Sequence, residues 1–408
     1  MQAIKSHMTK KTRHYLCALF FDGLSTGLFL MALPWLMLSG EGNGLFVASV
    51  AIVCTAASFL VTPFFATLID RHSRKLILLS MQGLQALTAV ITLLVSIYVE
   101  NQLIWLAAAQ LIFWVSSDVA WTASNAFVQE NFQPEEYAQL AGRQEVVLQG
   151  TTLAAGALGI LLLQRWSLTE FALFASIASS LGWLFFLLTP YNRQPRSLQS
   201  KASFKAELVQ SASLVKAQPR FFALLMLSTL SYPLLTYLAK LVPIWFAEQG
   251  VSGSWFSAYY LSFGLGSLLV GFVIQKLLAR FQQTQIMLAA LFAISLLLLT
   301  VANILTPIFV VGFAALFGVF NAANRIARIN WMHHQIEVSK RGRSEGVLTL
   351  FSIATQNLSY VVIALLSAQK ITHYGFYIAA VVMLFAALAF YGLVKGRTAL
   401  NDSLTVKT

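Results

Sequence analysis

The sequence predicts an all-α membrane protein with twelve transmembrane helices arranged as two six-helix bundles. Hydrophobic residues make up 58% of the 408 residues and charged residues only 10%, whereas a soluble domain has roughly 25% charged residues. The mean hydropathy is +0.73. Apolar runs long enough to cross a bilayer, which takes about 20 residues, recur along the whole chain. We therefore exclude a water-soluble globular protein.

The twelve apolar runs divide evenly around a polar, basic segment at residues 191–220. We expect domains at 1–190 and 221–408, joined by this segment as a linker. In the linker, Phe204, Leu208, Ala212 and Val215 fall on one helical face, which predicts an amphipathic helix on the membrane surface. The alternative is a solvated linker. The predicted spans are 15–38, 45–69, 76–99, 103–127, 140–163, 168–188, 221–246, 255–277, 286–304, 308–332, 347–366 and 374–394.

Basic residues gather on one side of this predicted topology. The two ends of the chain and the even-numbered loops hold 22 of the 27 Lys and Arg residues, and the odd-numbered loops hold two. Loops rich in Lys and Arg stay in the cytoplasm. We expect both termini in the cytoplasm, and we attribute the net charge of +12 to membrane topology and not to nucleic-acid binding.

A repeated motif indicates that the two halves are copies of one unit. Residues 142–148 read GRQEVVL and residues 342–348 read GRSEGVL, which match at five of seven positions. Each motif opens a predicted helix, the fifth and the eleventh. We interpret Arg143 with Glu145, and Arg343 with Glu345, as structural pairs, because a carboxylate in a first helical turn is stabilised by the helix dipole.

A charged hinge joins the second and third predicted helices. Residues 66–75 read ATLIDRHSRK, so Asp70, Arg71, Arg74 and Lys75 form a short loop that cannot lie in hydrocarbon. This loop resembles the one between helices two and three of the major facilitator superfamily, with a Gly-x-x-x-Asp-Arg-x-x-Arg-Lys core in which Ala66 here replaces the Gly. Residues 271–280 carry a fainter copy with Gln275 in place of the acid.

The resemblance to this superfamily covers the whole chain and implies a transporter that alternates between inward-open and outward-open states. It also implies that Asp70 faces the start of the eleventh helix and locks the inner gate. ALPW at 32–35 and RGR at 341–343 resemble the branch of bacterial siderophore exporters and macrolide-type efflux pumps. The Gly-Pro-x-x-Gly-Gly signature of many antiporters is absent from residues 156–160, GALGI, so an outward direction rests on resemblance alone.

Five ionisable residues lie inside the predicted spans, where each costs about 2.5–3.5 kcal/mol unless it has a partner or a watery cavity. Two are acids, Asp22 and Asp118. Asp118, Trp121 and Asn125 share one face of the fourth helix by their spacing, a helix that lines the central cavity in the superfamily. For both acids, proton coupling or substrate contact competes with a structural hydrogen bond between helices.

The other three ionisable residues are the cations Lys240, Arg325 and Arg328. Asn321, Arg325 and Arg328 follow an i, i+4, i+7 spacing, with Asn324 beside them, and predict a cationic stripe that binds an anionic substrate. One alternative is that Arg325 pairs internally with Asp22 or Asp118. We expect Arg328 to reach water at the inner interface by snorkelling, and Lys240 either to help bind substrate or to snorkel outward.

Other chemistries find little support in the sequence. Cys17 and Cys54 lie in apolar runs, and the histidines lack metal-ligand spacing with carboxylates. No Gly-x-x-x-x-Gly-Lys loop is present, so we expect a gradient and not ATP to drive transport. The prediction is a monomer with no cofactor and no enzymatic activity, whose partners are a small molecule, protons and lipid.

The function that we expect is proton-coupled export of a mid-sized anionic metabolite, such as a carboxylate siderophore, or of a drug, across a bacterial inner membrane. Uptake of an organic anion or siderophore uses the same cationic residues in the other direction. A non-transporting receptor or scaffold on the same fold is a further alternative, but it would not need five buried ionisable groups.

Overall fold

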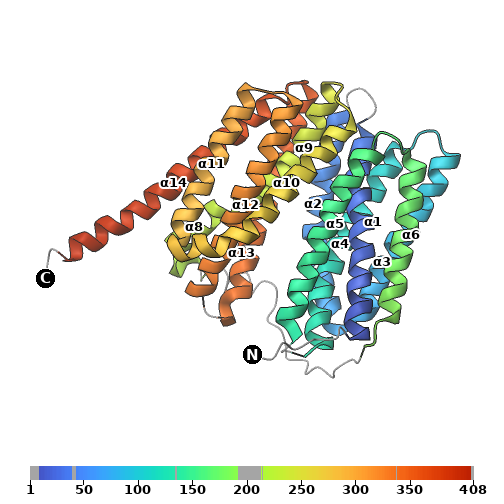
Figure 1. The fold of residues 1–408 in the computed structure, drawn as a ribbon, viewed down its shortest axis with the longest axis horizontal. Coiled ribbons are helices and arrows are strands. Elements are labelled where there is room, and N and C mark those ends of the chain that lie inside the picture. Colours follow the sequence, from blue (N-terminus) through green and yellow to red (C-terminus); the bar gives the residue numbers. More distant parts are fainter. Residues whose placement is uncertain are drawn as a thin grey trace. The chain divides into compact units, whose positions relative to one another are not determined.

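The computed structural model describes residues 9–38, 43–133, 136–191, 213, 215–336 and 338–405. Every element that it describes is helical (Figure 1). Most of the linker lies outside the described residues, as do the side chains of five predicted gating residues. The expected amphipathic helix at Phe204, Leu208 and Ala212 is therefore not described. The five side chains are those of Asp70, Arg71, Glu145, Arg343 and Glu345.

The chain separates into two compact units. The first comprises Met1–Asn43 and Val53–Gln199, and the second comprises Gly44–Ile52 and Ser200–Thr408. The helices of the first half are α1 (Lys10–Met37), α2 (Asn43–Arg71), α3 (Arg74–Tyr98), α4 (Leu103–Asn131), α5 (Tyr137–Leu162) and α6 (Leu168–Leu188).

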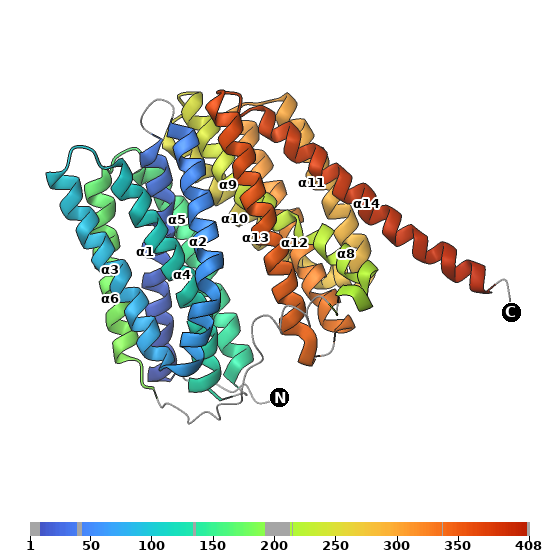
Figure 2. The same ribbon diagram turned by 180° about the vertical axis from the view of Figure 1, so that it is seen from behind.

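The second half contributes seven described helices, and the last of them, α14, extends beyond its neighbours in the second unit (Figure 2). Eleven stretches of the described chain are long and apolar enough to cross a membrane, and a shorter apolar stretch covers Val146–Gly159 of α5. The predicted all-helical membrane fold is thus confirmed. The helices are α8 (Pro219–Thr229), α9 (Ser231–Glu248), α10 (Gly253–Arg280), α11 (Gln283–Asn303), α12 (Pro307–Gln335), α13 (Val338–Ala368) and α14 (Tyr374–Thr405).

The two halves repeat the same pattern of helix packing. In the first, α1 packs on α4, α5 and α6, and α3 packs on α4 and α6. In the second, α8 or α9 packs on α12, α13 and α14, and α11 packs on α12 and α14. Each contact in the first half therefore has a counterpart six spans later, as expected of parallel repeats.

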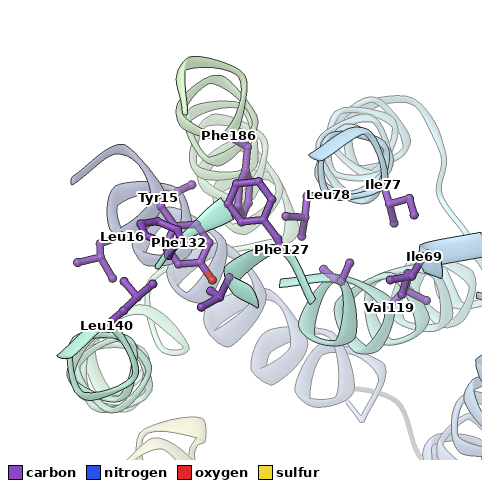
Figure 3. Close-up of a cluster of buried hydrophobic side chains, with 14 residues drawn as sticks. Tyr15, Leu16, Ile69, Ile77, Leu78, Val119, Phe127, Phe132, Leu140 and Phe186 are labelled. Atoms are coloured by element: carbon purple, nitrogen blue, oxygen red, sulfur yellow. The ribbon is translucent and has the colours of Figure 1, made fainter. Parts of the chain in front are cut away.

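The core of the first unit forms around a tyrosine. Tyr15 on α1 is fully buried and stacks on Phe127 of α4, with ring centroids 5.5 Å apart. Its hydroxyl lies 2.6 Å from Ser124 Oγ and accepts from Nε2 of Gln144 on α5 at 2.7 Å. Figure 3 shows Phe132 and Phe186 gathered around the same ring. One side chain thus joins three helices.

The predicted single seventh helix, 221–246, is interrupted at Leu230, between α8 and α9. Pro233 is the third residue of α9 and has no N–H to donate to Thr229 O, so the helical ladder cannot continue across the junction. The hydropathy of the whole stretch is that of one span, Pro219–Glu248. The prediction of one span holds, and the prediction of one unbroken helix is wrong.

The helices α10 and α12 approach closely at two glycines. A Cβ atom on Gly266 would overlap the carbonyl of Ala315, and one on Gly318 would overlap the carbonyl of Phe263. Ser262 Oγ also donates to Val311 O at 2.8 Å. The absence of side chains at two positions therefore allows backbone-to-backbone packing, as in other membrane helix pairs.

Two predicted helix starts were too late. The fifth predicted helix begins at Tyr137 instead of residue 140, and the eleventh begins at Val338 instead of residue 347. Neither helix has an acidic residue in its first turn. Glu145 and Glu345 lie about two turns inside, so our argument from the helix dipole does not apply to them. Both helices start in polar sequence ahead of the apolar run.

Candidate functional site

Asp22 lies near the middle of α1 and is partly buried in the first unit. Nε2 of Gln82, on α3, donates to Asp22 Oδ1, and Thr26 Oγ1 donates to the same oxygen at 3.4 Å. Among the residues that the structure describes, no cation forms an ion pair with Asp22. The acid is therefore held by neutral donors, which stabilise a carboxylate without fixing its charge.

A chain of polar side chains leads from Asp22 across α3 to α4. Gln82 Nε2 also donates to Gln85 Oε1 at 2.8 Å, and Gln85 Nε2 donates to Ser116 Oγ at 3.1 Å and to Ser117 Oγ at 3.0 Å. Both glutamine side chains are fully buried. The next residue along α4 is Asp118, which accepts from Ser58 Oγ of α2. Asp22 thus lies at one end of this network, and Asp118 follows its last residue, Ser117, in the sequence.

The predicted polar face of α4 is present. Asp118, Trp121 and Asn125 are all exposed, and the indole of Trp121 has 54% of its surface accessible. Ser116, Ala120 and Ala123, on the opposite side of the helix, are buried in the first unit. The α4 face therefore presents a carboxylate, an indole and an amide that the rest of the first unit does not cover.

The stripe on α12 divides into buried and exposed members. Asn324 is fully buried: Nδ2 donates to Ser228 O and to Ser231 Oγ, each at 2.8 Å, and Oδ1 accepts from Ser228 Oγ at 2.8 Å. Asn321 is buried and Arg325 is exposed. Arg325 makes no hydrogen bond or ion pair with another described residue. Its guanidinium is the one member of the stripe that is open to a ligand.

Snorkelling was expected for Arg328 and was one of two readings for Lys240, and the structure gives these cations different surroundings. Arg328 is only partly exposed, and its Nη1 donates to Ser228 O at 3.2 Å. Ser228 O, near the end of α8, therefore accepts hydrogen bonds from two side chains of α12, Asn324 and Arg328. Lys240 is buried, with 7% of its surface accessible, so it does not reach outward. Arg328 thus has a structural contact at the break.

The charged hinge at the α2–α3 junction is anchored inside the first unit. Ser73 caps α3 by accepting from Leu76 N at 3.3 Å. Arg74 donates to Ala126 O and lies 3.6 Å from Glu130 Oε2, measured from Nε. Lys75 Nζ donates to Leu187 O at 2.7 Å and Thr189 O at 2.8 Å, which caps the end of α6. Arg74 and Lys75 thus each contact other helices of the first unit.

Glu130 also binds the first residue of the predicted linker. Tyr191 OH donates to Glu130 Oε2 at 2.9 Å, and its ring stacks on Phe127 with centroids 5.5 Å apart. Burial raises the pKa of the Tyr191 hydroxyl above its usual value. Sequence reasoning missed Glu130 because the fourth predicted span ended at residue 127, a few residues short of the end of α4.

Gln82, Gln85 and Ser58 were also missed, although the sequence contained a signal for the first two. Gln82 and Gln85 are the two amides of the third apolar run and are spaced i, i+3, which places both on one helical face. Within the described residues, no group of three or more His, Cys, Asp or Glu side chains can hold a metal ion. Arg143 is partly exposed on α5.

The helical spans define a multi-pass membrane protein. The sequence profile of the Major Facilitator Superfamily matches residues 15–304. The chain belongs to this family of transporters, which are not enzymes. A search of curated protein sequences found no match.

Solved structures share the fold at low sequence identity. The POT family transporter PepTSo has a TM-score of 0.73 and 12% identity, with 96% of this chain and 98% of that chain covered. The nucleoside transporter NupG, as its D323A mutant, has a TM-score of 0.70 and 14% identity, covering 94% and 100%. A bacterial homologue of the iron transporter ferroportin has a TM-score of 0.69 and 16% identity, covering 95% and 99%.

Proposed function

We propose that this protein is a proton-coupled secondary transporter of a bacterial inner membrane that exports a mid-sized anionic metabolite, such as a carboxylate siderophore, or a drug. It works as an antiporter by alternating access, with both termini in the cytoplasm. The ALPW and RGR motifs support the siderophore and macrolide efflux branch. Solved structures of the same fold include proteins named for nucleosides, metal, iron and D-xylose with protons, so the fold does not favour one substrate.

The proposal of an anionic substrate depends on the surroundings of Arg325. Its guanidinium is exposed on α12 and makes no hydrogen bond or ion pair with another described residue, while Asn324 and Arg328 beside it are occupied at the α8–α9 break. An unpaired guanidinium at membrane depth is costly. A carboxylate that binds it through two parallel hydrogen bonds removes that cost. Asn321 and Lys240 are candidate helpers of Arg325, and Trp121 and Asn125 on α4 are separate candidates for substrate contact.

The observation that supports proton coupling is the pair of acids in the first unit. Neither Asp22 nor Asp118 forms an ion pair with a described cation. An acid that is not neutralised by a fixed cation can gain and lose a proton during a transport cycle. A receptor or scaffold would gain nothing from such groups.

Flux in proteoliposomes with an imposed pH gradient tests the coupling. We expect Asp22→Asn or Asp118→Asn to abolish gradient-driven transport while ligand binding persists. Glu170→Gln is a suitable control, because Glu170 is exposed and only caps α6. If both Asn variants keep wild-type proton-driven flux, neither acid couples protons. The direction of proton movement under an imposed ligand gradient separates export from uptake. Protons that move opposite to the ligand indicate antiport and export, and protons that move with the ligand indicate uptake.

Binding of neutral, cationic and polycarboxylate compounds to purified protein tests the role of Arg325. We expect Arg325→Ala to lower the affinity for polycarboxylates by about tenfold or more, as loss of a bidentate charged hydrogen bond predicts. Arg325→Lys should bind polycarboxylates nearly as weakly as Arg325→Ala, because an ammonium group cannot form the two parallel hydrogen bonds. Arg280→Ala, at the exposed end of α10, is the control. An unchanged ligand profile in Arg325→Ala would exclude an anionic substrate at this residue.

A further inference from the structure

The amide of Gln82 has an unused acceptor in the interior of the first unit. Gln82 is fully buried, its Nε2 donates to both Asp22 and Gln85, and its Oε1 accepts from no residue that the structure describes. Buried acceptors are nearly always satisfied. An exception that touches a titratable acid calls for an explanation by function.

Protonation of Asp22 would give that acceptor a donor. An ionised carboxylate only accepts hydrogen bonds, whereas a protonated one has an O–H to donate. The nitrogen and oxygen of an amide have nearly the same shape, so rotation by half a turn exchanges them without a change in packing. Gln82 Oε1 then accepts from Asp22 O–H.

The remaining members of the chain can reverse in the same way. When Oε1 of Gln82 faces Gln85, Gln85 must present Nε2 to it, and its own Oε1 then faces Ser116 and Ser117. Ser116 already donates its hydroxyl to Phe113 O at 3.1 Å. The hydroxyl hydrogen of Ser117 is not committed to any acceptor among the described residues, so Ser117 is the donor that completes the reversed chain.

Space for the rotation exists because residue 182 on α6 is glycine. A Cβ atom there would lie 2.7 Å from Gln82 Oε1 and 3.5 Å from Ala18 O. A larger residue would therefore press on the amide. After rotation, Gln82 Nε2 occupies this side.

We propose that Gln82, Gln85 and Ser117 form a reversible hydrogen-bond relay, which links the protonation of Asp22 to the hydrogen bonding of the residue next to Asp118. The relay rests on the proposed proton coupling and adds its internal connection. No proton moves along the amides: it stays on Asp22, and only the direction of the bonds reverses. Gln82 and Gln85 are positioning residues in this scheme.

The charged surroundings leave the two acids as the relevant groups. At the level of Asp22 lie Gln82 on α3, Thr151 on α5 and Gly182 on α6. The nearest Asp, Glu, Lys, Arg or His side chains that the structure describes on α1, α3, α5 and α6 are displaced by about two turns or more, and the side chain of Glu145 on α5 lies outside the described residues. On α4, Asp118 is the residue after Ser117, where the hydrogen-bonded side chains end. The displaced groups are His14 on α1, Arg74 and Lys75 on α3, Arg143 on α5 and Glu170 on α6.

Infrared difference spectroscopy of the purified protein in lipid nanodiscs, recorded across a pH titration, tests the relay. Carboxyl bands are assigned to Asp22 and Asp118 by their loss in Asp22→Asn and Asp118→Asn. We expect the Asp118 band to shift at the pH where Asp22 titrates, and this response to vanish in Asp22→Asn. In Gln85→Leu, Asp22 should still titrate while the Asp118 band no longer responds to it.

The control is Gln110→Leu, because Gln110 is a fully buried amide on α4 whose polar atoms bond to no described residue. It should keep the wild-type response. If Gln85→Leu does not fold, Ser117→Ala removes the last donor and Gly182→Ala displaces the first amide, and each should uncouple the bands.

An Asp118 band that responds equally in wild type and in Gln85→Leu or Ser117→Ala overturns the relay, as does an Asp22 band that does not titrate in wild type. Proteoliposome flux separates the two proposals. Proton-driven flux with uncoupled bands refutes only the relay. Coupled bands without proton-driven flux refute the proposed function and leave the relay standing as a feature of the first unit.

Discussion

At the scale of single residues, the interior of the first unit is organised by polar atoms that each join several helices. Tyr15 is an example, because one hydroxyl on α1 is bonded to Ser124 on α4 and to Gln144 on α5. Inside a membrane protein such bonds cannot be replaced by water when they break. The cost of losing one should therefore appear as lost stability.

Tyr15→Phe keeps the ring and its stacking but removes the hydroxyl. Ser124 and Gln144 would then lose a buried partner, and we expect the free energy of unfolding to fall by about 1–3 kcal/mol. Thermal unfolding of the detergent-solubilised protein measures this. Tyr98→Phe, at a side chain with 80% of its surface accessible, should change little. Equal melting temperatures for Tyr15→Phe and wild type would contradict the prediction.

The sequence reveals ionisable residues more readily than their partners. Asp22, Asp118 and Arg325 were recognisable because a charge in an apolar run is conspicuous. Their roles stay predictions. Gln82 and Ser58 were not found, because neutral polar residues are common in spans and a contact between helices depends on rotation about each axis, which a linear pattern does not fix. For the same reason the sequence left open whether Lys240 is buried, as it is in the structure, or reaches outward.

At the scale of helices, the junction between α8 and α9 is held by a neighbour. Pro233 prevents a continuous ladder, and Asn324 on α12 bonds to residues on both sides of the interruption, Ser228 and Ser231. Spacing alone could have suggested a kink from Pro233. It could not have shown which helix stabilises it, since Asn324 lies 96 residues beyond Ser228 in the sequence.

Asn324→Leu tests whether this junction depends on α12. Three hydrogen bonds would be lost at a fully buried position, and we expect destabilisation of about 2–4 kcal/mol from unsatisfied buried groups. The control is Asn303→Leu, because Asn303 is exposed at the end of α11 and its two hydrogen bonds, from its Nδ2 to Leu299 O and from Tyr377 OH to its Oδ1, are both at the surface. Denaturation in a detergent series gives both values. The idea fails if the two variants are equally stable.

The close contact of α10 and α12 yields a second prediction at this scale. Gly266→Ala and Gly318→Ala each place a methyl group against backbone, and we expect a loss of about 1–3 kcal/mol as the helices separate. Gly271→Ala and Gly312→Ala lie on the same two helices with nothing within 4 Å of the new atom. They should be neutral or slightly stabilising. Four equal melting temperatures would rule out this account.

At the scale of the whole molecule, the sequence was most informative about number and order of spans. Apolar length counts spans well because the bilayer imposes it. It locates helix ends poorly, since α13 starts nine residues before its predicted apolar run. The distribution of charge, with 22 basic residues on one side of the predicted topology and two on the other, predicts the orientation.

This distribution predicts that Met1, the linker at 193–220 and Thr408 all face the cytoplasm. Fusions of alkaline phosphatase and of green fluorescent protein at residues 200 and 408 check this, since the first is active only outside and the second fluoresces only inside. A fusion at residue 100, in an odd-numbered loop, is the control and should behave oppositely. Phosphatase activity of the fusion at residue 200 would contradict the predicted topology.

The junction between α8 and α9 has a consequence for biosynthesis. The ribosome releases Pro219–Glu248 as one apolar stretch, and an insertion channel that reads hydropathy accepts it as one segment. At that stage the Ser228 carbonyl lacks the hydrogen bonds from Asn324 and Arg328, because these residues are synthesised about a hundred residues later. Until α12 enters the bilayer, the seventh segment is an inserted but unfinished helix. A chain truncated before α12 should therefore be recognised by membrane quality control through this segment.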